Sequence, residues 1–193
     1  MSLSPSPVAQ PVPITIDPLT SDADARAFRE LNEEWIRRLF TLEAADSATL
    51  DDPVGAIVDR GGQVLIARLG DERIGCVALV PTGDGVFELS KMAVQPGLRG
   101  KGVGRQLITA AIILAGRLGA TSLFLGSSTK LPNAVHLYES VGFTHVPAER
   151  IRPMPYARAD VFMELPLTNA GSPANVQKTP DPRNLSPVGG HRE

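Results

Sequence analysis

The sequence lacks the features that mark secreted, disulfide-bonded and membrane-spanning proteins. Its 193 residues include one cysteine, Cys76, so an internal disulfide is excluded, and its apolar neighbours predict a core position. No apolar run is long enough to cross a bilayer. Met1 to Pro13 carries prolines and serines where a signal peptide needs a cationic start and an apolar core. We therefore expect a cytoplasmic protein.

The chain also lacks a large net charge and a metal-binding pattern. With 19 Lys and Arg against 21 Asp and Glu, its formal net charge is −2, which gives no general attraction to nucleic acid or to an anionic membrane. We expect neither as a partner. His136 and His145 have no second ligand at a metal-binding spacing, so no metal is expected. The apolar content of 42% over this length suits one domain with a substantial core.

What the sequence does contain is a glycine-rich stretch, Arg99-Gly100-Lys101-Gly102-Val103-Gly104, between a strand-like run and a helix-like run. Glycine allows close approach of the backbone to a ligand, and a helix N-terminus offers unpaired N–H groups to anions, so we expect phosphate here. No Ser or Thr follows Lys101, which argues against a magnesium nucleotide loop. The dinucleotide pattern fails too, because Arg105 and Leu107 stand where its last glycine would be.

Periodicity and turn residues predict an α/β chain of about seven strands and about four helices. The first helix is capped by Ser21 or Asp22 and places Phe28, Leu31, Trp35 and Leu39 on one face, and the helix from Val103 ends at Gly119. Strands are expected at 14–16, 64–68, 74–80, 87–94, 121–125, 144–146 and 160–165, and the other helices at 42–50 and from Pro132 to Gly142. Asn169 to Glu193 has too few apolar residues to form a core, which predicts a disordered tail.

Two linked motifs resemble those of the Gcn5-related N-acetyltransferases (GNAT). Arg99, Gly102 and Gly104 match R-x-x-G-x-G. The run from Asn133 to Phe143 matches N-x-x-A-x-x-x-Y-x-x-x-G-F, except that its alanine comes at Ala134. The resemblance implies the GNAT-type mixed α/β (α+β) fold over residues 12–168, after a flexible leader at 1–11 and before the tail at 169–193. It leaves a homodimer open.

The resemblance also implies the reaction, transfer of acetyl from acetyl-coenzyme A (acetyl-CoA) directly to a primary amine of a small metabolite or peptide, without a metal. The backbone of Met92, Ala93 and Val94 would bind the pantetheine arm, with Asn133 as a further contact or as a plain helix cap. The pyrophosphate would be held by the loop residues Arg99, Gly100, Lys101, Gly102, Val103 and Gly104, with Arg105 nearby.

Two side chains are candidates for proton transfer. Glu88 is the predicted base, because a carboxylate within an apolar strand is costly unless it lines a polar cleft; the alternative is a buried salt bridge to Lys91 or to a late arginine. Tyr138 is the predicted acid, since a phenol of pKa ~10 can protonate a thiolate. Its alternative role is packing on the apolar face of its helix.

The acceptor is less well determined by the sequence. Late arginines (Arg150, Arg152 and Arg158) could clamp a carboxylate or phosphate while early glutamates (Glu33, Glu34 and Glu43) orient an ammonium, or these residues are solvated charges. An amino-acid-like metabolite suits this pattern, and a peptide N-terminus, polyamine or aminoglycoside stays open. Two other functions are weighed against the enzyme: a non-catalytic acyl-CoA-binding regulatory module and an ATP-binding module.

Overall fold

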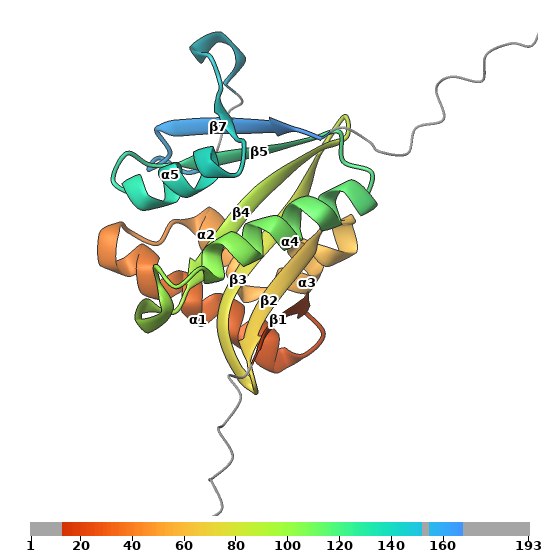
Figure 1. Cartoon of the computed structure of the whole chain (residues 1–193), viewed down its shortest axis with the longest axis vertical. Coiled ribbons are helices and arrows are strands. Elements are labelled where there is room, and N and C mark those ends of the chain that lie inside the picture. Colours follow the sequence, from red (N-terminus) through yellow and green to blue (C-terminus); the bar gives the residue numbers. More distant parts are fainter. Residues whose placement is uncertain (1–12, 152–154, 168–193) are drawn as a thin grey trace, which may run out of the picture.

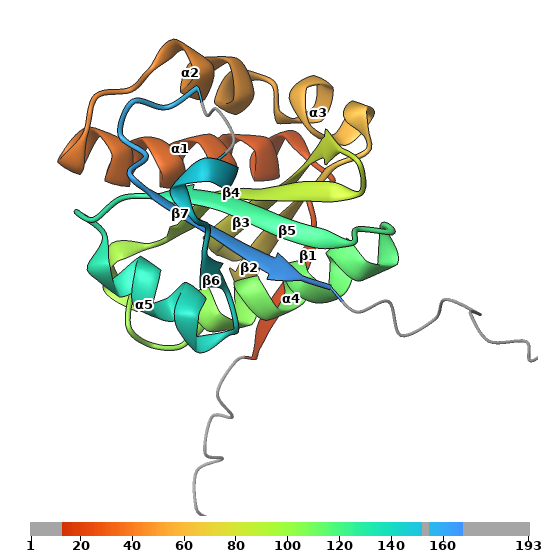
Figure 2. The same ribbon diagram turned by 90° about the horizontal axis from the view of Figure 1, so that it is seen from above.

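A computed structural model describes residues 13–151 and 155–167, which form a seven-stranded mixed sheet with helices on both faces (Figures 1 and 2). The strands are β1 (Ile14–Pro18), β2 (Gln63–Leu69), β3 (Glu72–Gly83), β4 (Val86–Val94), β5 (Ser122–Ser127), β6 (Thr144–His145) and β7 (Val161–Pro166). The helices are α1 (Asp22–Leu39), α2 (Ala44–Asp51), α3 (Pro53–Ala56), α4 (Val103–Arg117) and α5 (Pro132–Ser140). The strand order is β1-β2-β3-β4-β5-β7-β6.

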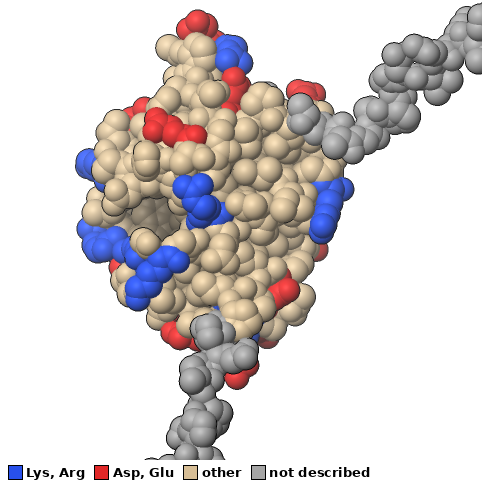
Figure 3. Space-filling model, in the orientation of Figure 1, with Lys and Arg blue, Asp and Glu red and all other residues tan. Residues whose placement is uncertain are grey.

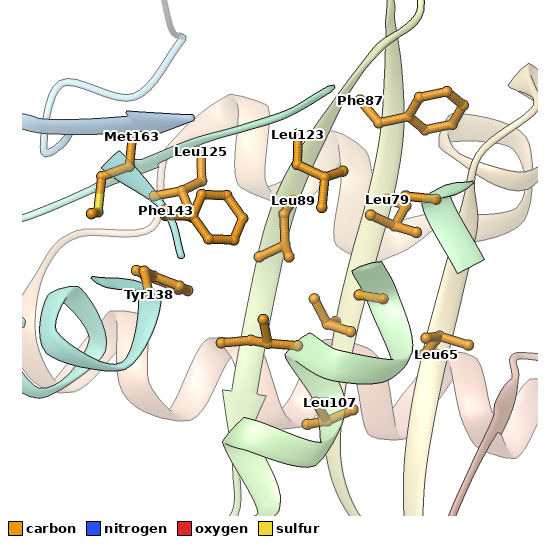
Figure 4. Packing of buried hydrophobic residues seen from close by; sticks show 14 of the residues in the cluster. Leu65, Leu79, Phe87, Leu89, Leu107, Leu123, Leu125, Tyr138, Phe143 and Met163 are labelled. Atoms are coloured by element: carbon orange, nitrogen blue, oxygen red, sulfur yellow. The ribbon is translucent and has the colours of Figure 1, made fainter. Parts of the chain in front are cut away.

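Each face of the sheet packs against its own helices. Alternate residues of β2 divide between two cores: Leu65 and Ala67 pack with α4, whereas Val64 and Ile66 pack with α1. Figure 4 shows the first core, with Leu107 of α4 beneath the strands and Tyr138 near Phe143. The α1 face and the α4 face are therefore two different environments, separated by the sheet.

Helix α1 begins as predicted but buries a different face. Ser21 is its N-cap and accepts a hydrogen bond from the backbone of Asp24. The predicted face is wrong in part: Phe28 is buried, but Leu39 is 40% exposed, and Asn32 and Ile36 are fully buried instead. The physical reason is a polar contact that periodicity cannot reveal, because the Asn32 amide donates to the carbonyl of Lys91, 59 residues away.

Helix α3 is an addition to the four predicted helices. The helix predicted at 42–50 corresponds to α2, and Pro53 follows its end closely. It is also the first residue of α3, where the missing N–H of proline costs nothing, and Asp52 caps that turn through the backbone of Gly55. The same dipeptide thus ends one helix and starts the next.

Helix α4 follows the glycine-rich stretch as predicted. Val103, Leu107 and Ala111 are buried against the sheet, and the helix ends just before Gly119, whose φ of +82° suits glycine. Ala115 is the last residue of the helix that is buried, and Leu118 after it is 40% exposed.

Among the strand pairs that the structure describes, only β4 with β5 is parallel, and this pairing is short. Three residue pairs join the two strands, of which Glu88 with Phe124 is the last. Beyond Glu88, β4 continues to Val94 with β3 on one side and no described strand on the other, so on that side it has no strand partner. The two strands diverge beyond this point (Figure 1).

Several expectations lie outside the described residues: the leader at 1–11, the tail at 169–193 and Arg152. Among the residues that the structure does describe, no helix is long and apolar enough to cross a membrane.

Candidate active site

A cavity of about 850 Å³ lies where β4 and β5 separate. It is lined by the C-terminal end of α1, the second half of β4, the glycine-rich loop, the segment from β5 into α5, and the segment before β7. Figure 3 shows a hollow on the face of the molecule that carries α4, with Lys and Arg side chains around it. Elements far apart in the chain therefore meet at one enclosed site with a cationic entrance.

A β-bulge in β4 shapes the floor of the cavity. Cys76 pairs with Ala93 and Ala78 with Ser90, so β4 carries one extra residue between two consecutive pairs with β3. Lys91 lies in this bulge with a φ of +51°, a strained value for a residue with a side chain. The buried Asn32 amide holds the Lys91 carbonyl at 3.2 Å, which stabilises the bulge from the α1 face.

The bulge reverses which side chains of β4 face which helix. In a regular strand, residues four apart point to the same face. Leu89, before the bulge, packs in the core on the α4 face, whereas Ala93, after the bulge, packs in the core on the α1 face. Lys91 turns toward α2, while Met92 packs against the α4 core. Glu88 pairs with Val80, which packs in the α1 core, so the Glu88 and Lys91 side chains share the α1 face of the site.

The Glu88 carboxyl is half-buried and lines the cavity. Burial raises its pKa, and the positive charge of Lys91 offsets part of that effect. The alternative of a salt bridge to Lys91 or to a late arginine is not what the structure shows, since within residues 13–151 and 155–167 Glu88 forms no ion pair. A carboxyl with a raised pKa and no cationic partner is suited to accepting a proton.

Lys91 instead belongs to a buried charge cluster around Asp46. The Asp46 carboxylate is fully buried and accepts from the Lys91 ammonium at 2.6 Å and from the Arg158 guanidinium at 2.7 and 2.8 Å. Burial alone would raise the pKa of Asp46, but these hydrogen bonds lower it to about 2. Arg158 also reaches Glu43, and Lys91 donates to the Tyr156 hydroxyl at 2.9 Å. The cluster ties α2, β4 and the segment before β7 together.

The glycine-rich loop presents backbone to the cavity. Gly102 is the N-cap of α4 with a φ of +86°, and no side chain caps the helix, so the first N–H groups of α4 are open to an anion. A Cβ on Gly104 would lie 3.1 Å from Leu137 of α5, so the residue must stay small where the two helices approach. Arg105 hydrogen-bonds Ser140, and Arg99 contacts the Val94 carbonyl.

Tyr138 lines the cavity from the α4 side of the sheet. It is 8% exposed, its ring lies 6.0 Å from that of Phe143, and burial raises the pKa of its phenol to about 12. Tyr138 therefore packs in the core and also contributes to the wall of the cavity. Asn133 also lines the cavity, but its alternative role as a helix cap is wrong, because Leu131 is the N-cap of α5 and Asn133 lies inside the helix.

The comparisons with known proteins point to the same family as the two motifs. The model of a family described as "Acetyltransferase (GNAT) domain" matches residues 60–145. The uncharacterized N-acetyltransferase YvbK of Bacillus subtilis is 34% identical over 117 residues, which is 59% of this chain and 72% of that protein. The uncharacterized N-acetyltransferase C1271.07c of Schizosaccharomyces pombe is 30% identical over 166 residues, 82% of this chain and 98% of that one. The chain belongs to the GNAT acetyltransferase family.

Solved structures share the fold. A GNAT acetyltransferase from Staphylococcus aureus has a TM-score of 0.73 at 18% identity, covering 81% of this chain and all of that one. A Salmonella typhimurium protein solved with its cofactor acetyl-CoA has a TM-score of 0.64 at 24% identity, covering 83% and 97%. The seven-stranded mixed sheet expected from the motifs is thereby confirmed, with five helices in place of about four.

Most site residues predicted for this GNAT acetyltransferase line the cavity between β4 and β5. They are Glu88, Met92, Ala93, Val94, Arg99, Gly100, Gly102, Gly104, Arg105, Asn133 and Tyr138. Two do not: Val103 is buried in the core beneath the loop, and the Lys101 side chain is exposed outside the lining. The core role predicted for Cys76 holds, since it is fully buried.

Of the residues predicted to bind the acceptor, some line the cavity and others lie outside its lining. Arg158 lines the cavity, whereas Arg150 pairs with Glu164 of β7 and is not among the lining residues. Glu33 pairs with Arg29 and Arg37 and is not among the lining residues either. Asp46 was not predicted from the sequence. Its only local signal is an acidic residue within a predicted helix, which cannot reveal a partner 45 residues away.

Proposed function

We propose that the chain transfers acetyl from acetyl-CoA directly to a primary amine of a small metabolite or peptide. The observation that supports this best is the continuity of the cavity from the open N-terminus of α4, along the unpaired side of β4, to Glu88. An anionic group at one end and an amine at the other would meet in the gap between β4 and β5. A cytoplasmic location belongs to the same proposal, because Cys76 is a free thiol, as is usual in a reducing compartment.

The residues present fit coenzyme A. The α4 N-terminus would bind the pyrophosphate through its N–H groups, with Arg99 and Arg105 as cationic neighbours. The backbone of β4 around Met92 to Val94 lies beyond its pairing with β5 and would pair with the amides of the pantetheine arm like an added strand, beside the Val94 carbonyl that Arg99 binds. The same stretch of β4 bears the bulge, and an N–H group released there from the regular ladder would polarise the thioester carbonyl.

Glu88 would remove the proton from the attacking amine. It lies on the α1 face of β4, opposite to the side from which α4 and α5 would hold the cofactor. Its raised pKa makes the carboxylate a stronger base than an exposed glutamate. In the transfer the amine nitrogen forms a bond to the acetyl carbon, the carbon–sulfur bond breaks, and the amine proton passes to Glu88.

Tyr138 would stabilise the departing sulfur. Because burial raises its pKa to about 12, the phenol is fully protonated at neutral pH and always available as a donor. A thiol near pKa ~8.5 is a much stronger acid than this phenol. Hydrogen-bond donation to the thiolate is therefore favoured over complete proton transfer from Tyr138.

The alternative function is a non-catalytic acyl-CoA-binding module that regulates a partner. It would need the loop and the β4 backbone but not a carboxyl group in the cavity. Glu88 favours the enzyme, because a half-buried carboxyl with no ion-pair partner among the described residues costs stability and is explained by a role in proton transfer.

The test is a screen of amines for acceptor-dependent release of free thiol from acetyl-CoA. Calorimetry first establishes coenzyme A binding in the presence of a chelator. Wild-type protein is then compared with Glu88→Gln and with Glu139→Gln, a matched control on the exposed surface of α5. We expect release with at least one amine, strongly reduced in Glu88→Gln only. Binding without release from any amine would favour the regulatory module.

A further inference from the structure

The acceptor half of the cavity has a distinct composition. It lies on the α1 face and is lined by Trp35, Arg38, Leu39, Phe40, Tyr156 and Arg158, with Lys130 from the loop before α5. Apolar and aromatic surface is thus combined with cations. Among the cavity-lining residues that the structure describes, Glu88 is the sole carboxylate.

The acids close to this half are already neutralised by the protein itself. Asp46 is bound by Lys91 and Arg158, and Glu43 is bound by Arg158. Their charges balance within a buried cluster, where removing a partner is costly. A polyamine or an aminoglycoside, whose several ammonium groups need several carboxylates, would find only Glu88.

The aromatic rings are also occupied on their faces by the protein's own cations. The Arg158 guanidinium carbon lies 4.7 Å from the Tyr156 ring centroid, 5.9 Å from that of Trp35 and 6.0 Å from that of Phe40. A second cation from the acceptor would meet like charge at these faces. The rings still offer edges and apolar surface to an uncharged body.

Lys130 is the cation in this half with the least internal compensation. Its ammonium lies 5.5 Å from the Phe40 ring centroid, and within the described part of the chain no carboxylate lies within 4.0 Å of it. Arg38 is close in the chain to Phe40 and has only a long contact of 3.8 Å to Glu34. An anionic group at Lys130 would therefore gain a charge-assisted hydrogen bond without displacing an existing ion pair.

We propose that the acceptor is an amino-acid-like monoamine with an apolar side chain and a carboxylate that Lys130 binds. This inference rests on the proposed acetyl transfer. The amine approaches Glu88, the apolar side chain lies against Phe40 and Trp35, and the carboxylate reaches Lys130.

The experiment compares acceptor pairs that share a carbon skeleton and differ in the presence of the carboxylate. Leucine is measured against isoamylamine and phenylalanine against phenethylamine, together with spermidine and kanamycin, by thiol release from acetyl-CoA. Because an α-amino group is less basic than an alkylamine, kcat/KM is calculated on the concentration of the neutral amine. We expect this kcat/KM to be at least about tenfold higher for each amino acid than for its amine, the effect of one charge-assisted hydrogen bond. Equal or faster acetylation of the amines, or preference for spermidine or kanamycin, would overturn the inference while leaving acetyl transfer intact.

Variants of Lys130 then test whether this residue binds the carboxylate of the acceptor. Lys130→Met should raise KM for leucine about tenfold and leave isoamylamine unchanged, and Lys130→Arg should restore the preference. Arg37→Met is the control, since Arg37 is an exposed cation on α1 paired with Glu33 outside the cavity. If Lys130→Met raises KM for acetyl-CoA instead, Lys130 binds a cofactor phosphate and the inference is wrong.

A binding measurement keeps the two proposals separable. With coenzyme A saturating, calorimetry compares N-acetylleucine with N-isoamylacetamide. Preference for the carboxylate would support the acceptor class even if no thiol release is seen, in which case the proposed acetyl transfer alone would fail. No preference would count against the acceptor class.

Discussion

Burial of Glu88 determines the pH at which the reaction can proceed. A base works only when unprotonated, and burial raises the pKa of Glu88 above its usual 4.5. Activity should therefore rise with pH through this higher pKa. Glu88→Gln should lower turnover by on the order of 10²-fold near neutral pH, with coenzyme A affinity unchanged. Raising the pH should recover part of the loss, because more of the acceptor amine is then already neutral. The measurement is the pH profile of turnover for both proteins.

Tyr138→Phe provides the comparison for that profile. It removes the donor to the sulfur and keeps the ring that packs near Phe143, so turnover should fall without recovery at high pH. If Glu88→Gln instead loses nothing, or loses equally at every pH with normal cofactor binding, Glu88 has only a structural role and the base lies elsewhere.

The ion pair between Arg99 and Glu34 allows a test of whether Arg99 binds a cofactor phosphate. The Arg99 guanidinium contacts Glu34 of α1, so a phosphate that binds Arg99 must compete with this carboxylate. Glu34→Gln should tighten coenzyme A binding about two- to fivefold, the size expected for a partly exposed pair. Glu33→Gln is the matched control, because Glu33 pairs with Arg29 and Arg37. Weaker binding in Glu34→Gln by calorimetry would show that Arg99 works by tying the loop to α1.

Single residues with distant partners are the part of the site that the sequence could not predict. Glu88, Tyr138 and the glycine loop are recognisable because their motifs are local. Asp46 and Asn32 are not, because each acts through Lys91, which lies 45 and 59 residues away. The sequence shows the charge of Lys91 but not the bulge that places its side chain on the α1 face, where it binds Asp46 of α2.

At the scale of elements, α4 was predictable because its pattern and its glycine boundaries are both local. Helix α1 shows the limit: its spacing is helical, but the buried position of Asn32 depends on a tertiary hydrogen bond, so the predicted face is rotated. Helix α3 was missed because Pro53 is compatible with both an end and a start.

The junction of the loop with α4 can be tested by one substitution in that helix. Gly104→Val places side-chain atoms where a Cβ alone lies 3.1 Å from Leu137, next to the proposed phosphate site. We expect a folded protein whose affinity for coenzyme A falls at least about tenfold. Gly116→Val is the control, since Gly116 is in the same helix with open space around it. Calorimetry with circular dichroism decides: a folded Gly104→Val protein that binds as wild type contradicts the assignment of the loop.

At the scale of the whole molecule, the divergence of β4 and β5 creates the site without interrupting either core. The cores on the two faces of the sheet lie on opposite sides of the gap, so cofactor and acceptor can enter from different faces. The order of helices and strands along the sequence indicated this fold. The gap arises because only three residue pairs join β4 and β5, and the sequence of each strand alone does not show where pairing with its neighbour ends.

Removal of residues 169–193 tests whether the domain is complete without them. The cavity lining and the two cores that the structure describes lie within residues 13–167, so coenzyme A affinity and the thermal unfolding midpoint should stay unchanged. Loss of folding in the truncated protein would show that the prediction for this segment is wrong.

The most direct test of the central claim is the stoichiometry of transfer in one reaction mixture. Mass spectrometry follows the intact protein and the acceptor while free thiol is measured with acetyl-CoA and an amine. We predict that thiol and N-acetylated amine appear in equal amounts and that the mass of the protein does not change. Thiol release accompanied by a stable acetyl group on the protein, or no amine-dependent release while coenzyme A binds, would contradict direct transfer.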